Sequence, residues 1–239
     1  MGRVVSIARR EMQSYFNSPV AYIVLGVFLL IAGYLYFSTL FLTGFASLRN
    51  FFSVAPVLLV VFAPALTMRL IAEERKSGTI EHLLTLPVTD LEVVVGKFLA
   101  ALGTMCVGLF VTIPYPLSVA LLTPTGRSLD FGPVIGGYLG LILLSSAFLS
   151  LGLFASSLTR NQIVAFIIGL LMSFILFFID KFAVLMPTAL APVFEFLSVD
   201  YHFNNIERGV VDSRDVLFYA SLTLIALMLT VYSLRTRRN

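Results

Sequence analysis

The side chains that most often carry chemistry are few in this sequence, and their spacing does not form a catalytic group. Cys106 is the only cysteine, which excludes an intramolecular disulfide and a cysteine-based metal site. His82 and His202 fall on opposite sides of the predicted membrane topology, so they cannot share a metal, and we expect each to be a solvated or locally bonded surface side chain. The Gly-Lys pair at 96–97 is followed by Phe and lacks the upstream glycine of a phosphate-binding loop. We therefore expect no active site, metal or cofactor in this chain.

Charged residues are concentrated in one segment, 69–87, which reads RLIAEERKSGTIEHLLTLP. Gly78 is suited to positive φ and to ending a first, charged helix, Thr79 is suited to be the N-cap of a second short helix, and Pro87 ends that helix. The second helix would be amphipathic. We interpret the segment as a docking element that receives a push from a partner protein, whereas the charges considered alone favour a solvated loop.

Long apolar stretches surround this segment and identify lipid as the solvent. Of the 239 residues 59% are hydrophobic and 12% charged, and the mean hydropathy is +0.98, whereas soluble domains carry roughly 25% charged residues. A helix needs about 20 apolar residues to cross a bilayer. The stretches that meet this length are 20–42, 51–68, 93–122, 134–158, 163–182 and 216–234. We predict an all-α membrane protein, one domain over residues 1–239, with six transmembrane helices.

The distribution of basic residues predicts the orientation of these spans. An even number of spans places both termini on one side, and with the termini inside, eleven of the 16 Lys and Arg residues are cytoplasmic. Residues 69–92 are then a cytoplasmic coupling region and residues 181–215 an extracytoplasmic loop. The net charge of +3 does not indicate nucleic-acid binding, because the basic residues cluster at the ends of apolar runs.

The first 18 residues predict an interfacial amphipathic helix that ends before Pro19. Its apolar residues fall within about 120° of one face, and Ile7 breaks the pattern. That apolar face comprises Val4, Val5, Ala8, Met12, Tyr15 and Phe16. The alternative is a positively charged topology anchor. The outer segment 181–215 contains an apolar patch at 193–197 that favours short interfacial helices, with a structureless loop as the alternative.

Within the spans, small residues and prolines predict local features rather than a transport pathway. Gly136 and Gly140 form a small-xxx-small pair, which we assign to packing within the chain rather than to a dimer contact. Pro114 and Pro116 are expected to kink the third span, and Pro56 and Pro64 the second, where neighbouring side chains can satisfy the freed carbonyls. The spans hold essentially no ionisable residue, which argues against an ion or proton pathway. Asp180 and Lys181 lie near an outer span end, where they can pair or reach water.

Residues 72–88, AEERKSGTIEHLLTLPV, resemble the signature between the second and third spans of ABC-2 type permeases. The resemblance extends along the chain in span order and length. More narrowly, the segments FNSP at 16–19 and FNNIERGVVDSRD at 203–215 resemble the gliding-motility-associated permease subgroup. The family resemblance implies a coupling helix that contacts an ATPase subunit. The positions that match the family are Glu73, Glu74, Arg75, Gly78, Thr79, Glu81, Leu83, Leu84 and Pro87.

This resemblance implies the membrane-spanning permease subunit of an ATP-driven ABC transporter in the bacterial cytoplasmic membrane. ATP and Mg would be bound and used by a separate ATPase subunit, and the chain itself would not be an enzyme. The implied partners are that ATPase, a second permease copy or homologous permease, and an auxiliary extracytoplasmic or membrane subunit. The alternative is a non-transporting scaffold or mechanotransmission module that moves an extracytoplasmic partner. The substrate is not legible from the residues.

Overall fold

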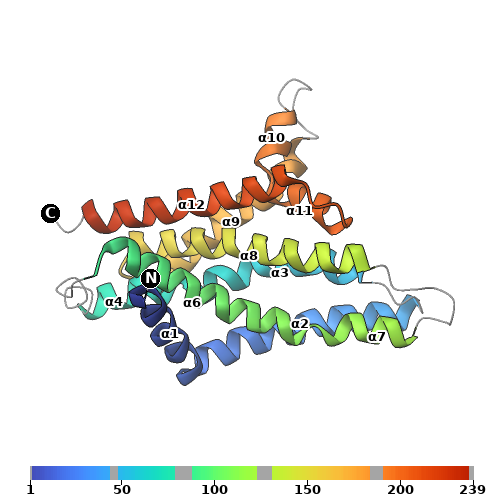
Figure 1. Ribbon diagram of the computed structural model, residues 1–239, viewed down its shortest axis with the longest axis horizontal. Helices are drawn as coiled ribbons and strands as arrows, with labels where there is room; N and C mark the ends of the chain where they lie inside the picture. Colours follow the sequence, from blue (N-terminus) through green and yellow to red (C-terminus); the bar gives the residue numbers. More distant parts are fainter. Residues whose placement is uncertain (1, 44–47, 79–87, 123–130, 184–190, 237–239) are drawn as a thin grey trace.

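The computed structural model describes residues 2–43, 48–78, 88–122, 131–183 and 191–236, which form helices with no strand among them (Figure 1). The long helices are α2 (Pro19–Thr43), α3 (Arg49–Thr67), α6 (Asp90–Val111), α8 (Phe131–Leu158), α9 (Gln162–Ala183) and α12 (Ser213–Thr236). The shorter ones are α1 (Gly2–Asn17), α4 (Arg69–Ser77), α7 (Pro114–Leu122), α10 (Ala191–Leu197) and α11 (Val199–Glu207).

Six helical segments of the described chain are long and apolar enough to cross a membrane, which confirms the predicted all-α fold with six spans. The second of these runs through α3 and α4, and the third through α6 and most of α7. Figure 1 shows the spans side by side, with α1, α4 and the end of α12 at the same end of the bundle. The predicted span boundaries agree with the observed helices to within a few residues.

The third span is broken at Thr112 and Ile113, as its prolines predict. Pro116 has no N–H to donate to the Thr112 carbonyl, which instead accepts from the Tyr115 amide at 2.9 Å and from the Tyr138 hydroxyl at 3.0 Å. The Tyr36 hydroxyl donates to the Tyr115 carbonyl at 3.2 Å. A side chain from α8 therefore helps to satisfy the Thr112 carbonyl that Pro116 frees, and Tyr36 ties α2 to the same region. Pro56 and Pro64, in contrast, lie inside an unbroken α3.

Helix α8 is the central element of the bundle. In its apolar window 72% of the residues are buried, against 22% in α9, whose exposed side chains are large and apolar. Glycine and serine allow this burial, because they let neighbouring helices approach the α8 backbone closely. The buried small residues of α8 include Gly136, Gly137, Gly140, Ser145, Ser150, Gly152 and Ser156.

Gly136 and Gly140 face α11 of the same chain. A Cβ added at Gly136 would collide with the carbonyl oxygen of Ile206, and one added at Gly140 would lie 3.0 Å from the Phe203 ring. The small-xxx-small pair is therefore used for packing within the chain, as predicted.

Helix α1 forms as predicted, and part of its surface packs against α6. A Cβ at Gly96 of α6 would lie 2.6 Å from Ile7, which is therefore on the packed face and does not interrupt it. Val5, assigned to the apolar face, is 63% exposed. Met12 meets Gly103 of α6 and Tyr15 is buried. The glycines of α6 decide which side of α1 approaches it, and the interfacial placement of the helix stays a prediction.

The described part of segment 181–215 forms two short helices, α10 and α11, rather than a structureless loop. Val193, Phe196 and Leu197 of the predicted apolar patch are exposed on α10, which stands away from the bundle in Figure 1. Lys181 pairs with Asp180 and with Asp200 of α11, each at 2.8 Å. These ion pairs confirm the expected pairing and hold α11 close to the end of α9.

Replacement of Gly136 by Ala tests the close approach of α8 and α11. We expect Gly136→Ala to lower stability by about 1–3 kcal/mol, because the new methyl group meets backbone that cannot turn aside. The matched control is Gly26→Ala on α2, where an added Cβ meets no described atom within 4 Å. Thermal unfolding of the purified chain in lipid nanodiscs measures both, and equal transition temperatures for the two variants would contradict this packing.

Candidate functional site

The candidate site lies at the end of the bundle where α1, α4, the start of α6 and the end of α8 meet. Helix α4 follows α3 after a single turn residue, Met68, whose side chain does not cap it. The first backbone amides of α4 are instead hydrogen-bonded by a side chain from another helix. Ser156 of α8 accepts hydrogen bonds from the amides of Ile71 at 3.1 Å and Ala72 at 3.0 Å, and its hydroxyl donates to the Met68 carbonyl at 2.9 Å. Ser156 therefore fixes the beginning of α4 to the central helix.

The other end of α4 is fixed by Arg75 and Gly78. Arg75 donates to the Ser157 carbonyl in the last turn of α8, where the carbonyls have no partner within their own helix. Gly78 ends α4 with φ of 73°, which confirms the predicted helix end at positive φ. Helix α4 is thus hydrogen-bonded to α8 near both of its ends.

A buried lysine joins three helices at this site. Lys97 of α6 is 1% exposed, and its ammonium group lies 2.6 Å from Glu74 of α4 and 3.1 Å from Glu11 of α1. The two carboxylates come from different helices, so one cation holds α1 and α4 to α6. Lys97 lies near the start of the predicted stretch 93–122 and of the third membrane-length segment, and it is an exception to the expectation that the spans hold essentially no ionisable residue.

A second set of polar contacts fixes the joint between α3 and α4. The Tyr15 hydroxyl donates to the Leu66 carbonyl at 2.8 Å, and the Arg69 guanidinium lies 4.8 Å from the centre of the Tyr15 ring. Burial raises the pKa of Tyr15 far above its usual value, although the nearby Arg69 charge opposes this. The phenol therefore stays protonated as a donor. Arg69 also donates to Ser18 at 3.0 Å, which ties the start of α2 to the same joint.

An open groove of about 400 Å³ separates the exposed parts of α1 and α4. Arg10 and Ser14 line it from α1, and Glu73 and Ser77 from α4. The groove is polar, and both of its walls are held by the Lys97 ion pairs. A protein segment that entered it would contact both helices at once.

The structure separates the predicted coupling residues into two groups. Glu73 is exposed on α4, whereas its neighbour Glu74 is bound to Lys97, and Arg75 and Gly78 have the structural roles described above. The remaining predicted residues, Thr79, Glu81, Leu83, Leu84 and Pro87, lie outside the described residues, as does the predicted second helix. Of these two glutamates, Glu73 is therefore the exposed one, and Glu74 is used within the chain.

Several residues of this site were not identified from the sequence. Ser156, Tyr15, Glu11 and Lys97 come from α8, α1 and α6, and no local pattern links them to α4. The one signal available was a lysine, Lys97, one turn into an apolar stretch, since a charge there requires a partner.

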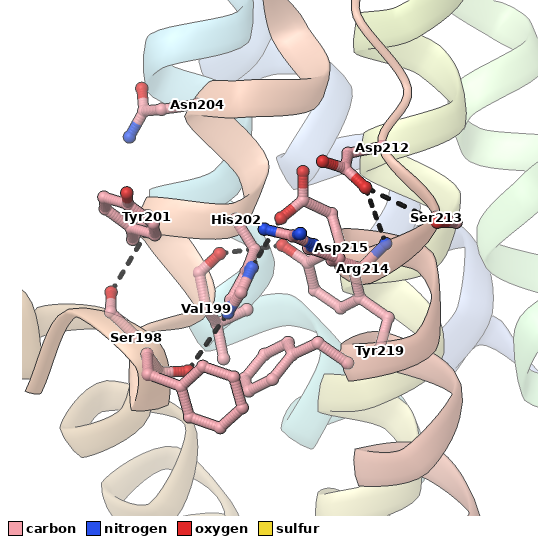
Figure 2. A network of polar contacts seen from close by, with 12 residues as sticks. Ser198, Val199, Tyr201, His202, Asn204, Asp212, Ser213, Arg214, Asp215 and Tyr219 are labelled. Atoms are coloured by element: carbon pink, nitrogen blue, oxygen red, sulfur yellow. Dashed lines mark hydrogen bonds and ion pairs between the residues drawn. The ribbon is translucent and has the colours of Figure 1, made fainter. Parts of the chain in front are cut away.

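A different polar network lies around α11 and the start of α12 (Figure 2). His202 is 5% exposed and lies 2.6 Å from Asp215 through Nδ1. The expectation of a surface histidine is therefore wrong, although His202 is locally bonded. It is buried because Phe218 of α12 stacks on its ring at 4.0 Å between centroids. Among the described residues no three His, Cys, Asp or Glu side chains group as a metal site.

The fold and this site define a multi-pass helical membrane protein with a polar helix, α4, held at one end of the bundle. The sequence model of the ABC-2 family transporter proteins matches residues 5–234, so the chain belongs to that family. A search of curated proteins found no match. Family membership identifies the chain as a membrane permease component of an ABC transporter, a type of transport component that is normally not catalytic.

Removal of the Ser156 hydroxyl tests how α4 is positioned. We expect Ser156→Ala to lower stability by about 2 kcal/mol, because two amides of α4 lose their buried acceptor. The matched control is Ser150→Ala on the same helix, because the Ser150 hydroxyl donates only to Ala147 of α8 itself. Thermal unfolding in nanodiscs should show a clear loss for the first variant and little change for the second. A larger loss of stability in Ser150→Ala than in Ser156→Ala would contradict the role of Ser156 in positioning α4.

Neutralisation of Lys97 tests the three-helix ion cluster. We expect Lys97→Met to lower stability by about 3 kcal/mol, because it removes the buried ammonium group that both carboxylates share. The double variant with Glu74→Gln should recover part of this loss, since it removes one of the two charges. Lys76→Met, at an exposed lysine of α4, is the control and should behave like the wild type. If the double variant recovered no stability, the ion pairs would not be the cause of the loss in Lys97→Met.

Proposed function

We propose that this chain couples ATP hydrolysis by a separate nucleotide-binding subunit to export or movement across the membrane. Closure of the ATPase would push on α4 and the following segment to residue 87, and the permease would alternate between two packings. Because α4 is bound to α8, α6 and α1 through Ser156, Arg75 and Lys97, a force on α4 reaches three other helices directly. That attachment is the observation that carries the proposal.

The proposed orientation places α4 and both termini in the cytoplasm of a bacterial cell. The excess of Lys and Arg on that side supports it. Support also comes from Figure 1, in which α1, α4 and the end of α12 lie at one end of the bundle. In this arrangement ATP and Mg are bound by the partner ATPase, and a second permease copy or a homologous permease completes the membrane part.

A second candidate function is mechanical rather than transporting. In this alternative the chain belongs to the gliding-motility-associated subgroup and moves an extracytoplasmic or membrane partner. The segments at 16–19 and 203–215 support the subgroup, and the exposed Val193, Phe196 and Leu197 of α10 offer a contact surface for such a partner. ATP-dependent flux of a defined substrate into reconstituted vesicles favours transport. ATP-dependent rearrangement of a bound partner without flux favours the mechanical function.

Charge reversal at Glu73 tests the ATPase contact. We expect Glu73→Lys to reduce copurification of the ATPase and stimulated hydrolysis about tenfold, which corresponds to about 1.4 kcal/mol of binding free energy. Insertion and thermal stability should be unchanged, because Glu73 is exposed. Glu74→Lys is a less specific test, since it also breaks the internal pair with Lys97.

The control for this experiment is Glu195→Lys, the same charge change on the exposed surface of α10. It should leave association with the ATPase intact. Unchanged copurification and hydrolysis in the Glu73→Lys complex would disprove the assignment of this surface.

A further inference from the structure

The buried pair His202 and Asp215 connects three helices at the outer segment. His202 belongs to α11, Asp215 to the first turn of α12, and both are at most 5% exposed. The second ring nitrogen of His202, Nε2, lies 3.0 Å from the carbonyl oxygen of Phe196 in α10. This carbonyl belongs to the last turn of α10, where backbone acceptors have no partner within the helix. The imidazole therefore lies between α10 and α12.

A neutral imidazole and a carboxylate together carry one proton that can be donated. The two contacts of His202 require two such protons. A carbonyl oxygen only accepts, so Nε2 must carry a hydrogen to bond Phe196. A neutral imidazole then has no hydrogen on Nδ1, and Nδ1 would face the Asp215 carboxylate at 2.6 Å with two lone pairs opposed. The contact is favourable only if a proton lies on Nδ1 or on the Asp215 oxygen.

We propose that His202 and Asp215 form a one-proton site, and that the shared proton latches α10 to α12. With the proton bound, both nitrogens of His202 are satisfied and α10 is held through the Phe196 carbonyl. Without it, the imidazole can bond either Phe196 or Asp215, but not both. The Tyr219 hydroxyl donates to the Val199 carbonyl at 2.7 Å, so α11 stays on α12 in either state and the change is confined to α10.

The contact that Asp215 makes to a group able to carry positive charge is the one to the His202 ring, at 2.6 Å. The second oxygen of Asp215, Oδ2, is buried and has no hydrogen-bond partner among the described residues. The nearest cation on α9, Lys181, is already bound by Asp180 and Asp200. Other titratable or charged groups on the neighbouring elements include Glu195 of α10, Tyr201 and Glu207 of α11, Arg208 and Asp212 between α11 and α12, and Arg214 and Tyr219 of α12.

The direction of the pH effect follows from proton counting. The latched state holds one proton more than the open state, so lower pH favours it and it is lost as the pH rises. Above the midpoint, the ratio of the protonated to the deprotonated pair falls about tenfold per pH unit, and α10 is then held only in the tautomer that bonds Phe196. This inference does not depend on the proposed coupling to an ATPase.

The test is a pH titration of the position of α10 in the full chain in lipid nanodiscs. A spin label at Val193→Cys, in a Cys106→Ser background, reports the motion of α10 between about pH 5 and pH 9. We expect the label to be immobile at low pH and to become mobile in a one-proton transition. In Asp215→Asn the transition should disappear with the label immobile throughout, because the introduced amide donates to Nδ1 of a neutral His202.

The matched control is Asp212→Asn, which removes an exposed carboxylate three residues away and should leave the transition unchanged. If Asp215→Asn does not fold, His202→Gln serves instead, because it removes the titrating ring and should also abolish the transition. A label whose mobility is constant with pH in the wild-type chain, or a transition that survives Asp215→Asn or His202→Gln, would overturn the proposal.

Discussion

Polar groups that enter the apolar interior of this bundle have to find partners within the chain, and this requirement determines how its helices meet. An unpaired backbone group in hydrocarbon costs several kcal/mol, and an unpaired charge costs more. The broken third span is possible because Tyr138 reaches the Thr112 carbonyl. In the same way, Ser156 binds the first amides of α4, and Tyr15 binds the Leu66 carbonyl next to the α3–α4 joint. Each irregularity is thus fixed by a side chain from another helix.

The central position of α8 extends this requirement to packing. An apolar helix is solvated by lipid about as well as by another apolar helix, so the hydrophobic effect hardly drives helix association inside the membrane. Close packing between helix backbones has to stabilise the bundle instead. The glycines and serines of α8 allow that contact on several sides, with α11 over Gly136 and with the end of α3 over Gly152. Most of the surface of α9 does not pack against another helix, and many of its exposed residues are large and apolar.

The two polar regions of the molecule have different consequences for function. Around α4, strong contacts to α8, α6 and α1 make the helix a rigid attachment point, and they leave Glu73 as the carboxylate that faces outward. Around α11, a neutral His202 ring has one N–H, but it faces two acceptors, the Phe196 carbonyl and the Asp215 carboxylate. A fully satisfied network rigidifies its surroundings, whereas one that needs an additional proton has two states. The rigid region is suited to transmitting force and the second to responding to its medium.

The sequence by itself determined the number of spans, the interruption at Pro114 and Pro116, the end of α4 at Gly78 and the presence of a polar segment after the second span. These features follow from hydropathy, from the missing proline N–H and from the φ preference of glycine, which act within a few residues. Only the tertiary structure decided that Lys97 pairs with Glu11 and Glu74, that Ile7 faces α6, and that His202 is buried against Asp215. Those contacts join residues from different helices, and their geometry depends on how the helices are rotated and spaced, which no local pattern records.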